Sequence, residues 1–284
     1  MTNEELKKVQ RAQLELAKIV KRICDENNIN YFMIAGTLLG AVRHKGFIPW
    51  DDDLDVGMLR KDYEKFISIC KDYLSPQVIL QTWDNEKEYP LPFAKLRWKD
   101  TLYVERNSRN INMNKGIYID IFVFDNVPEK KFDRIKQKYM SLYYFKVLFA
   151  KCGGTPWSEK QKFKKLCYGF IKIWSKLFTY DFLHKHMTKC MTKYNNTPSD
   201  KIVAIGGAYG YDRETIQRKW IEEVHDVDFE ESTLSAPVLY DEYLSYFYGD
   251  YMTPPPENKR GNRHLIVELN FGSLNDINID EVVK

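Results

Sequence analysis

Two aspartates, Asp53 and Asp55, stand two residues apart in a short acidic run that leads into an apolar segment. Alternate residues of an extended strand point to the same face, so this spacing predicts that both carboxylates point the same way. Carboxylates that close repel each other unless a cation lies between them, and hard oxygen ligands suit Mg²⁺ or Mn²⁺. The pattern favours a metal-dependent site for phosphoryl or nucleotidyl transfer. Acidic runs also occur in solvated loops and at helix N-termini, which is the alternative.

A turn of small residues at Gly36 and Thr37 precedes the acidic run. Backbone N–H groups of a glycine-containing turn that opens a helix can hold phosphate, and residues 38–45 have the pattern of such a helix. The helix ends with Arg43 and His44, which would bring positive charge close to the carboxylates. Cations beside a metal site suit a polyphosphate ligand. These four residues are therefore predicted substrate contacts, with ordinary surface charge as the alternative for the two cations.

A third carboxylate, Asp120, stands among apolar residues in the expected strand 116–124. An acidic residue in such a strand is costly to bury without a partner, so we expect Asp120 to lie beside the metal. Lys95 belongs to another expected strand, 93–98, and is a further candidate contact for phosphate. Surface charge is again the alternative for this lysine.

Positive charge also gathers near the C-terminus, after the proline run 254–256. Arginine is well suited to bidentate contact with phosphate, so these cations could close over a bound nucleotide. A solvated basic tail is the alternative. The residues concerned are Lys259, Arg260, Arg263 and His264.

Residues 31–66 resemble the signature of the LicD family of phosphocholine transferases, which are related to the fukutin-type alditol-phosphate transferases. The segment 116–122 is similar to the strand that carries the third carboxylate of the wider nucleotidyltransferase-fold superfamily. Residues 248–252, with the prolines and cations after them, resemble the family's C-terminal block. Thr37 replaces the superfamily's usual serine, in agreement with the narrower family. Residues 130–200 carry no comparable motif.

The resemblance implies an α/β (α+β) fold with a nucleotidyltransferase-type mixed sheet, flanking helices and a helical extension. It implies transfer of phosphocholine from CDP-choline to a sugar hydroxyl of a cell-surface glycan or glycolipid precursor, with release of CMP. Asp53, Asp55 and Asp120 would be the catalytic residues and hold Mg²⁺ or Mn²⁺, and Asp120 would accept the proton of the attacking hydroxyl. Sugars of lipopolysaccharide, teichoic acid, capsule and glycolipids, including lipid-linked ones, all fit as acceptors.

Other functions fit the same residues. Nucleotidyl transfer from an NTP to a small hydroxyl compound would release pyrophosphate, and CDP-ribitol or CDP-glycerol could replace CDP-choline as donor. A non-catalytic protein that binds nucleotide or membrane has no need for three converging carboxylates. Choline is a quaternary ammonium and calls for an aromatic cage, for which Trp50, Trp83 and Trp98 are candidate walls, although tryptophans in strands are usually core residues.

The elements that must position these residues divide the chain into three expected portions: a catalytic core at 1–128, a helical region at 129–200 and a C-terminal portion at 201–284 that completes the site. Hydrophobic periodicity predicts a first helix that ends near Asn28. Further helices are expected at 61–73 and 239–248, and strands at 31–35, 53–58 and 78–83.

The helical region has two unusual segments, the densely aromatic 139–150 and the lysine-rich, aromatic 160–178. They form either helices that pack on the core or a basic, aromatic surface that rests on the anionic inner leaflet of a membrane, and the two are compatible. His184 and His186 match no zinc pattern and are expected at the surface.

Composition excludes several classes of protein. The 284 residues are 44% hydrophobic, which is ample for a core, and a net charge of +3 argues against a dedicated nucleic-acid binder. The N-terminal segment is charged throughout, unlike a signal peptide, and no apolar stretch reaches membrane-spanning length. The five cysteines include no CxxC and fit reduced thiols. We expect a cytoplasmic protein that could associate with the inner face of the membrane.

Overall fold

The computed structural model describes residues 1–155, 162–261 and 264–275. Its helices are α1 (Asn3–Asn27), α2 (Ala35–His44), α3 (Arg60–Ile69), α4 (Lys131–Lys151), α5 (Lys162–Ser175), α6 (Tyr180–Thr192) and α7 (Tyr240–Tyr248). Its strands are β1 (Phe32–Met33), β2 (Asp55–Leu59), β3 (Val78–Gln81), β4 (Ala94–Trp98), β5 (Leu102–Glu105), β6 (Tyr118–Asn126), β7 (Lys201–Ala204), β8 (Thr215–Gln217), β9 (Val224–Phe229), β10 (Ser232–Pro237) and β11 (Ile266–Asn270).

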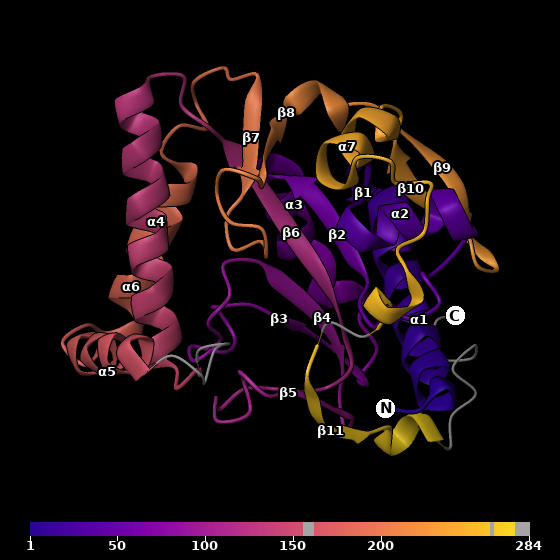
Figure 1. Ribbon diagram of the computed structural model, residues 1–284, viewed down its shortest axis with the longest axis horizontal. Helices are drawn as coiled ribbons and strands as arrows, with labels where there is room; N and C mark the ends of the chain where they lie inside the picture. Colours follow the sequence, from indigo (N-terminus) through magenta and orange to yellow (C-terminus); the bar gives the residue numbers. More distant parts are fainter. Residues whose placement is uncertain (156–161, 262–263, 276–284) are drawn as a thin grey trace.

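A mixed sheet of seven strands forms the centre of the molecule (Figure 1). The order β1-β2-β6-β4-β3 contains one parallel pair, β2 with β6, and β7 pairs with the second half of β6 and carries β8. Smaller sheets pair β9 with β10 and β5 with β11. This architecture confirms the expected α+β core with a mixed sheet and flanking helices.

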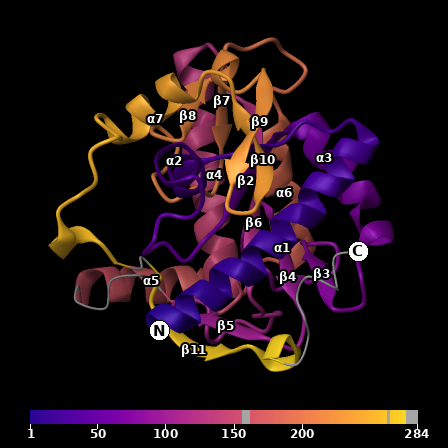
Figure 2. The ribbon, with the colours of Figure 1, turned by 90° about the vertical axis from the view of Figure 1, so that its right-hand side faces the viewer.

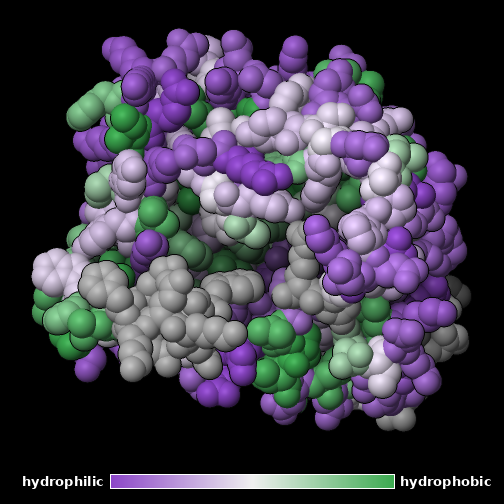
Figure 3. Space-filling view, viewed as in Figure 1, coloured by the Kyte–Doolittle hydropathy of each residue, from purple (hydrophilic) through white to green (hydrophobic). Residues whose placement is uncertain are grey.

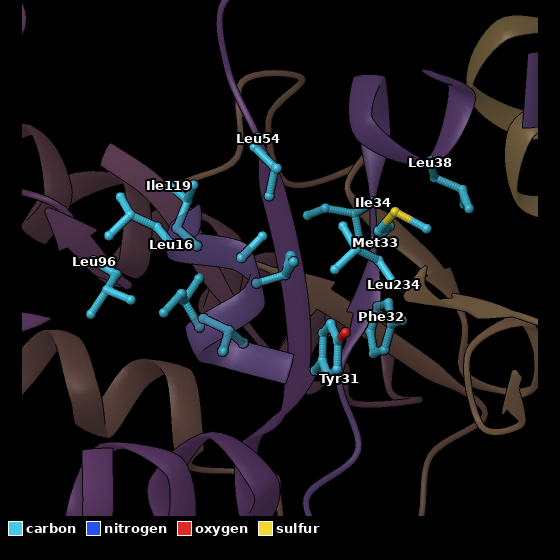
Figure 4. Close-up of a cluster of buried hydrophobic side chains, with 14 of the residues drawn as sticks. Leu16, Tyr31, Phe32, Met33, Ile34, Leu38, Leu54, Leu96, Ile119 and Leu234 are labelled. Carbon is cyan, nitrogen blue, oxygen red and sulfur yellow. The ribbon is translucent and has the colours of Figure 1, made fainter. Parts of the chain in front are cut away.

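Helix α1 lies across the sheet and covers β6 and β4 (Figure 2). Thr2 and Glu5 form a capping box at its start, and Asn28 ends it in the left-handed conformation, so the chain turns directly into β1. Its apolar face joins the core cluster of Figure 4, where Leu16 packs near Leu96 and Ile119. The other labelled side chains come from the segment 31–38, from Leu54 just before β2 and from Leu234 of β10, so this cluster fixes the segments on both sides of the acidic run.

Helices α4, α5 and α6 stand to one side of the sheet, where α4 packs against both of the others and α6 also contacts β6 (Figure 1). The described part of the expected lysine-rich segment begins at residue 162. Helix α5 leaves an apolar face exposed, which lies at the lower left of Figure 3. Its exposed apolar side chains are Leu166, Phe170, Ile173 and Trp174. Within the described ranges, each helix is too short or too polar to cross a membrane.

Most expected elements of the core are present, with two differences that concern the site. Helix α2 begins at Ala35, so Gly36 and Thr37 lie in its first turn rather than before it. Strand β2 begins at Asp55, so Asp53 lies in the loop that precedes the strand. The division into residues 1–128, 129–200 and 201–284 stays a prediction, and the pairing of β7 with β6 crosses it.

His184 differs from expectation, because it is buried rather than at the surface. Its ring stacks on Trp83 with a centroid separation of 4.6 Å, and its Nε2 is buried with no hydrogen-bond partner among the described residues. Burial therefore lowers the pKa of His184 to about 4. The same stack places Trp83 against α6.

We expect His184 to make the fold sensitive to acid. The unfolded chain binds a proton near pH 6.5 and the folded chain near pH 4, so stability falls as the pH drops between these values. The full effect is about 2–3 kcal/mol. His184→Phe keeps a stacked ring without a titrating group, and urea unfolding at pH 7 and pH 5 should show a smaller loss of stability than in the wild type. Equal losses would contradict this account.

Candidate active site

A cavity of about 590 Å³ lies where five parts of the chain meet: the start of α2, the acidic run, the turn after β7, helix α7 and the chain after α7. The last of these, called the C-terminal segment below, contributes lining residues between Asp250 and His264. Helices α2 and α7 are in direct contact, and Figure 2 shows them side by side. The volume is in the range of small-molecule sites. Six of the predicted site residues line the cavity: Gly36, Arg43, Asp53, Asp55, Lys259 and His264.

The acidic run supplies the floor of the cavity, and local hydrogen bonds fix its position. The N–H of Asp55 donates to the hydroxyl of Thr37 at 2.8 Å, so Thr37 orients the run from behind and does not line the cavity. Asp51 lines the cavity as well, and a Cβ at Gly36 would lie 2.6 Å from its Oδ2. Gly36 therefore provides the space that this carboxylate occupies.

Strand pairing collects charge at one level of the sheet. Asp55 of β2 pairs with Asp120 of β6, and Asp120 pairs in turn with Lys95 of β4. Burial and the negative charges of Asp53 and Asp120 raise the pKa of Asp55 well above its usual range. Three buried or half-buried charged groups thus stand in a row across adjacent strands.

Lys95 has a different neighbour from the predicted phosphate. Its ammonium is buried, binds the carboxylate of Asp120 and lies 3.3 Å from the centroid of the Tyr118 ring. Burial lowers the pKa of Lys95 and raises that of Asp120, while their attraction opposes both shifts. Neither residue is among those that line the cavity; Asp120 lies beside Asp55 on the neighbouring strand, and Lys95 lies beside Asp120 on the next.

Asp52, which was not among the residues predicted from the sequence, connects the C-terminal segment to the acidic run. It is fully buried, and its carboxylate accepts hydrogen bonds from the Tyr103 hydroxyl at 2.8 Å and from Nδ1 of His264 at 3.1 Å. The other imidazole nitrogen lies 3.9 Å from Oδ2 of Asp53. Alternation in the run, with Asp51 and Asp53 in the cavity and Asp52 behind them, is the signal that could have identified Asp52.

The electrostatics of His264 follow from these neighbours. Burial by itself lowers the pKa of His264, but the hydrogen bond to Asp52 and the charges of Asp53 and Glu105 outweigh it and raise the pKa to about 10. His264 therefore carries a positive charge at neutral pH and presents it to Asp53.

The remaining cations divide into two groups. Arg43 lines the cavity, and its guanidinium donates to the Tyr251 carbonyl at 2.8 Å and to Nε2 of His44 at 3.0 Å. Lys259 lines the cavity too. His44 and Arg260 do not; both lie against Trp50, with the His44 ring edge-on at 6.2 Å and the guanidinium at 5.1 Å. Arg263 lies outside the described residues.

Aromatic rings form much of the remaining wall. Of the candidate tryptophans, Trp50 lines the cavity, whereas Trp83 stacks on His184 and Trp98 is buried in the core, where its indole donates to the Ala12 carbonyl at 2.8 Å. The rings that sequence reasoning missed come from three separate segments: Phe122, Tyr209, Tyr243, Phe247 and Tyr248. Two more carboxylates, Glu214 and Asp250, also line the cavity.

The donor set suits a divalent cation that also binds the substrate. Within the described residues, no group of three histidine, cysteine or acidic side chains converges as a complete metal site. Mg²⁺ is commonly held by one or two carboxylates together with substrate phosphates and water. Asp53 and Asp55 fit this pattern, since both line the cavity, and burial together with the charge of Asp53 raises the pKa of Asp55.

Comparison with known proteins gives consistent matches. Residues 28–152 match a family model described as LicD/FKTN/FKRP, nucleotidyltransferase domain. The chain is 28% identical over 271 residues to the lipopolysaccharide cholinephosphotransferase LicD of Haemophilus influenzae, a match that covers 92% of this chain and 96% of that protein. The ribitol 5-phosphate transferase FKRP of Homo sapiens is 40% identical over 52 residues, or 18% of this chain and 10% of that protein.

We expect Asp52→Asn to lower the pKa of His264. Loss of the carboxylate charge should move the pKa of His264 from about 10 toward its ordinary 6.5, which NMR titration of the imidazole would measure. The raised pKa adds stability that is complete below pH 6.5 and lost as the pH rises through about 10, so the variant should be less stable at pH 7 by about 1–3 kcal/mol.

Asp226→Asn is the matched control, because Asp226 lies in β9 and contacts Lys21 rather than the cavity. An unchanged His264 pKa in Asp52→Asn would show that Asp52 does not hold the imidazole.

Proposed function

Because the chain belongs to the LicD family and is an enzyme that transfers phosphate-containing groups, we propose that it moves phosphocholine from CDP-choline to a sugar hydroxyl and releases CMP. The name of the Haemophilus influenzae relative supports lipopolysaccharide or a related cell-surface glycan as the acceptor. The observation that carries the proposal is a single cavity in which the Asp53 and Asp55 carboxylates meet Arg43, Lys259 and His264. A diphosphate with a bound metal ion needs carboxylates to hold the metal ion and positively charged side chains to bind the phosphate oxygens.

Asp53 and Asp55 would hold Mg²⁺ or Mn²⁺. When bound, the cation neutralises charge on the diphosphate and stabilises the CMP leaving group. Arg43 would bind phosphate oxygens in a fixed orientation, because the Tyr251 carbonyl and His44 already hold its guanidinium. Lys259 and His264 would add positive charge from the C-terminal segment.

The transfer step is a displacement at phosphorus. The acceptor hydroxyl forms a bond to the phosphorus that carries choline, the bond from that phosphorus to the CMP oxygen breaks, and CMP leaves with the electron pair. Asp120 lies next to Asp55 on the neighbouring strand but does not line the cavity, so it would take the hydroxyl proton through water and would support the metal site as a third carboxylate beside Asp55. Its burial raises its pKa, which strengthens it as a base, and Lys95 holds it in place.

Other phosphate donors would fit the same cavity residues. Similarity to a ribitol 5-phosphate transferase favours CDP-ribitol, with CDP-glycerol beside it, as the alternative phospho-alcohol donor. Nucleotidyl transfer from an NTP would release pyrophosphate in place of CMP. We also propose that the exposed apolar face of α5 brings the enzyme to the inner face of the membrane, where a lipid-linked acceptor would be available.

The donor and the metal can be tested together. We expect purified enzyme to release CMP from CDP-choline in the presence of lipopolysaccharide-derived oligosaccharide, to lose this activity with EDTA and to regain it with Mg²⁺. Asp53→Asn should lower the rate by about 100-fold or more. Thermal stabilisation by CDP-choline should require Mg²⁺ and disappear in the same variant.

Asp72→Asn, in the short helix Cys70–Tyr73, is the control and should keep full activity. If the enzyme releases pyrophosphate from CTP and no CMP from any CDP-alcohol, nucleotidyl transfer replaces the proposal. If CMP release continues in EDTA, the proposed role of the metal is wrong.

A further inference from the structure

We propose that Glu214 and the aromatic rings around it form a subsite for the quaternary ammonium group of the transferred phospho-alcohol. The inference rests on the proposed function and deepens it, since it assigns the residues that distinguish choline from uncharged alcohols such as ribitol and glycerol. Glu214 lies in the turn region between β7 and β8, outside residues 28–152 that match the family model.

Glu214 is a half-buried carboxylate that lines the cavity and has no salt-bridge partner among the described residues. One of its oxygens accepts a hydrogen bond from the Tyr209 N–H at 3.0 Å. The charge of the neighbouring Arg213 reaches Glu214 and partly opposes the rise of its pKa, but the guanidinium itself donates to the Phe247 carbonyl and lies 4.9 Å from the Tyr209 ring. A carboxylate that is partly removed from water and has no ion-pair partner is costly, and a bound cation would relieve that cost.

The backbone accommodates this carboxylate closely. A Cβ at Gly207 would overlap the Glu214 side chain, so the glycine turn after β7 can fold directly over it. Burial raises the pKa of Glu214 to about 7, as expected for a carboxylate in apolar surroundings. This environment strengthens attraction to a ligand cation, because little water screens the charge.

Aromatic rings surround the same part of the cavity. The Phe247 ring lies 4.8 Å from that of Tyr243 and 5.6 Å from that of Tyr209, and the hydroxyls of Tyr209 and Tyr248 are 3.4 Å apart. All four line the cavity with Glu214. A quaternary ammonium has no N–H to donate, so ring faces and an opposed carboxylate are the groups that recognise it. Hydroxyls of ribitol or glycerol would instead need a larger set of hydrogen-bonding partners.

One ligand can occupy this subsite and the acidic run together. The Tyr243 hydroxyl accepts a hydrogen bond from the N–H of Ala35 at 3.3 Å, at the start of α2 beside Gly36. The charges of both Glu214 and Asp55 reach Tyr243 and raise its pKa, in addition to the effect of burial. Tyr243 therefore stands between the proposed phosphate end of the cavity and the proposed ammonium end.

The test compares CDP-choline with its uncharged carbon isostere, the CDP ester of 3,3-dimethylbutanol, by calorimetric titration of the full chain with Mg²⁺. The wild type should bind CDP-choline about tenfold or more tightly than the isostere. Glu214→Gln keeps the volume and an acceptor for the Tyr209 N–H, and it should abolish most of this preference while the affinity for the isostere changes little. Glu222→Gln, at an exposed position, should leave the preference intact.

A second pair of variants tests the rings without relying on Glu214. Tyr248→Phe keeps the aromatic face and should retain the preference for CDP-choline, whereas Tyr248→Leu should reduce it several-fold. Thermal unfolding of each variant shows whether it is folded before its affinity is compared.

The outcomes separate this inference from the proposed function. Equal losses for both ligands in Glu214→Gln, or no preference in the wild type, would overturn the subsite while phosphocholine transfer stands. Binding and turnover of CDP-ribitol or CDP-glycerol in preference to CDP-choline would overturn the subsite and leave phospho-alcohol transfer in place. Binding of CTP alone, with pyrophosphate as product, would overturn both.

Discussion

The parallel pairing of β2 with β6 sets Asp55 beside Asp120 in the middle of the sheet, where their carboxylates repel each other. Several neighbouring groups supply positive charge that offsets this repulsion. Lys95, on the next strand, binds Asp120 from the buried side. The open side, where Asp53 and Asp55 face the cavity, is left with excess negative charge. A fold that buries carboxylates in this way loses stability unless cations are supplied, and the binding of a cation with its substrate is one way to supply them.

The C-terminal segment contributes to the same balance. His264 reaches Asp52 and faces Asp53, so a residue far along the chain places a positive charge at the acidic run. Strand β11 pairs with β5 immediately after it and fixes the segment on the core. Because His264 and Lys259 enter the cavity from this segment, the cavity is complete only when the segment is docked.

Local sequence patterns were informative where the signal is carried by neighbouring residues. Helix α1, the α2 turn and strands β2, β4 and β6 follow from periodicity and capping, and Gly36, Arg43 and Asp53 lie in the cavity as the motif suggested. Lys95 and Thr37 were placed in the right strand and turn, yet they contact Asp120 and Asp55 rather than the cavity. The direction of a buried side chain depends on strand pairing, which one strand's sequence does not contain.

The sequence by itself indicated phosphate-group transfer, because the segment 31–66 is a long local motif that combines closely spaced carboxylates with nearby cations. Only the tertiary structure decided what shares the cavity with them. Glu214 and Tyr243 come from separate segments with no motif of their own, and chain folding brings them to the cavity that Asp55 lines. It also decided that Trp98 is a core residue and that Asp52 is a buried anchor. Burial and charge compensation are properties of the assembled fold, so no local pattern could reveal them.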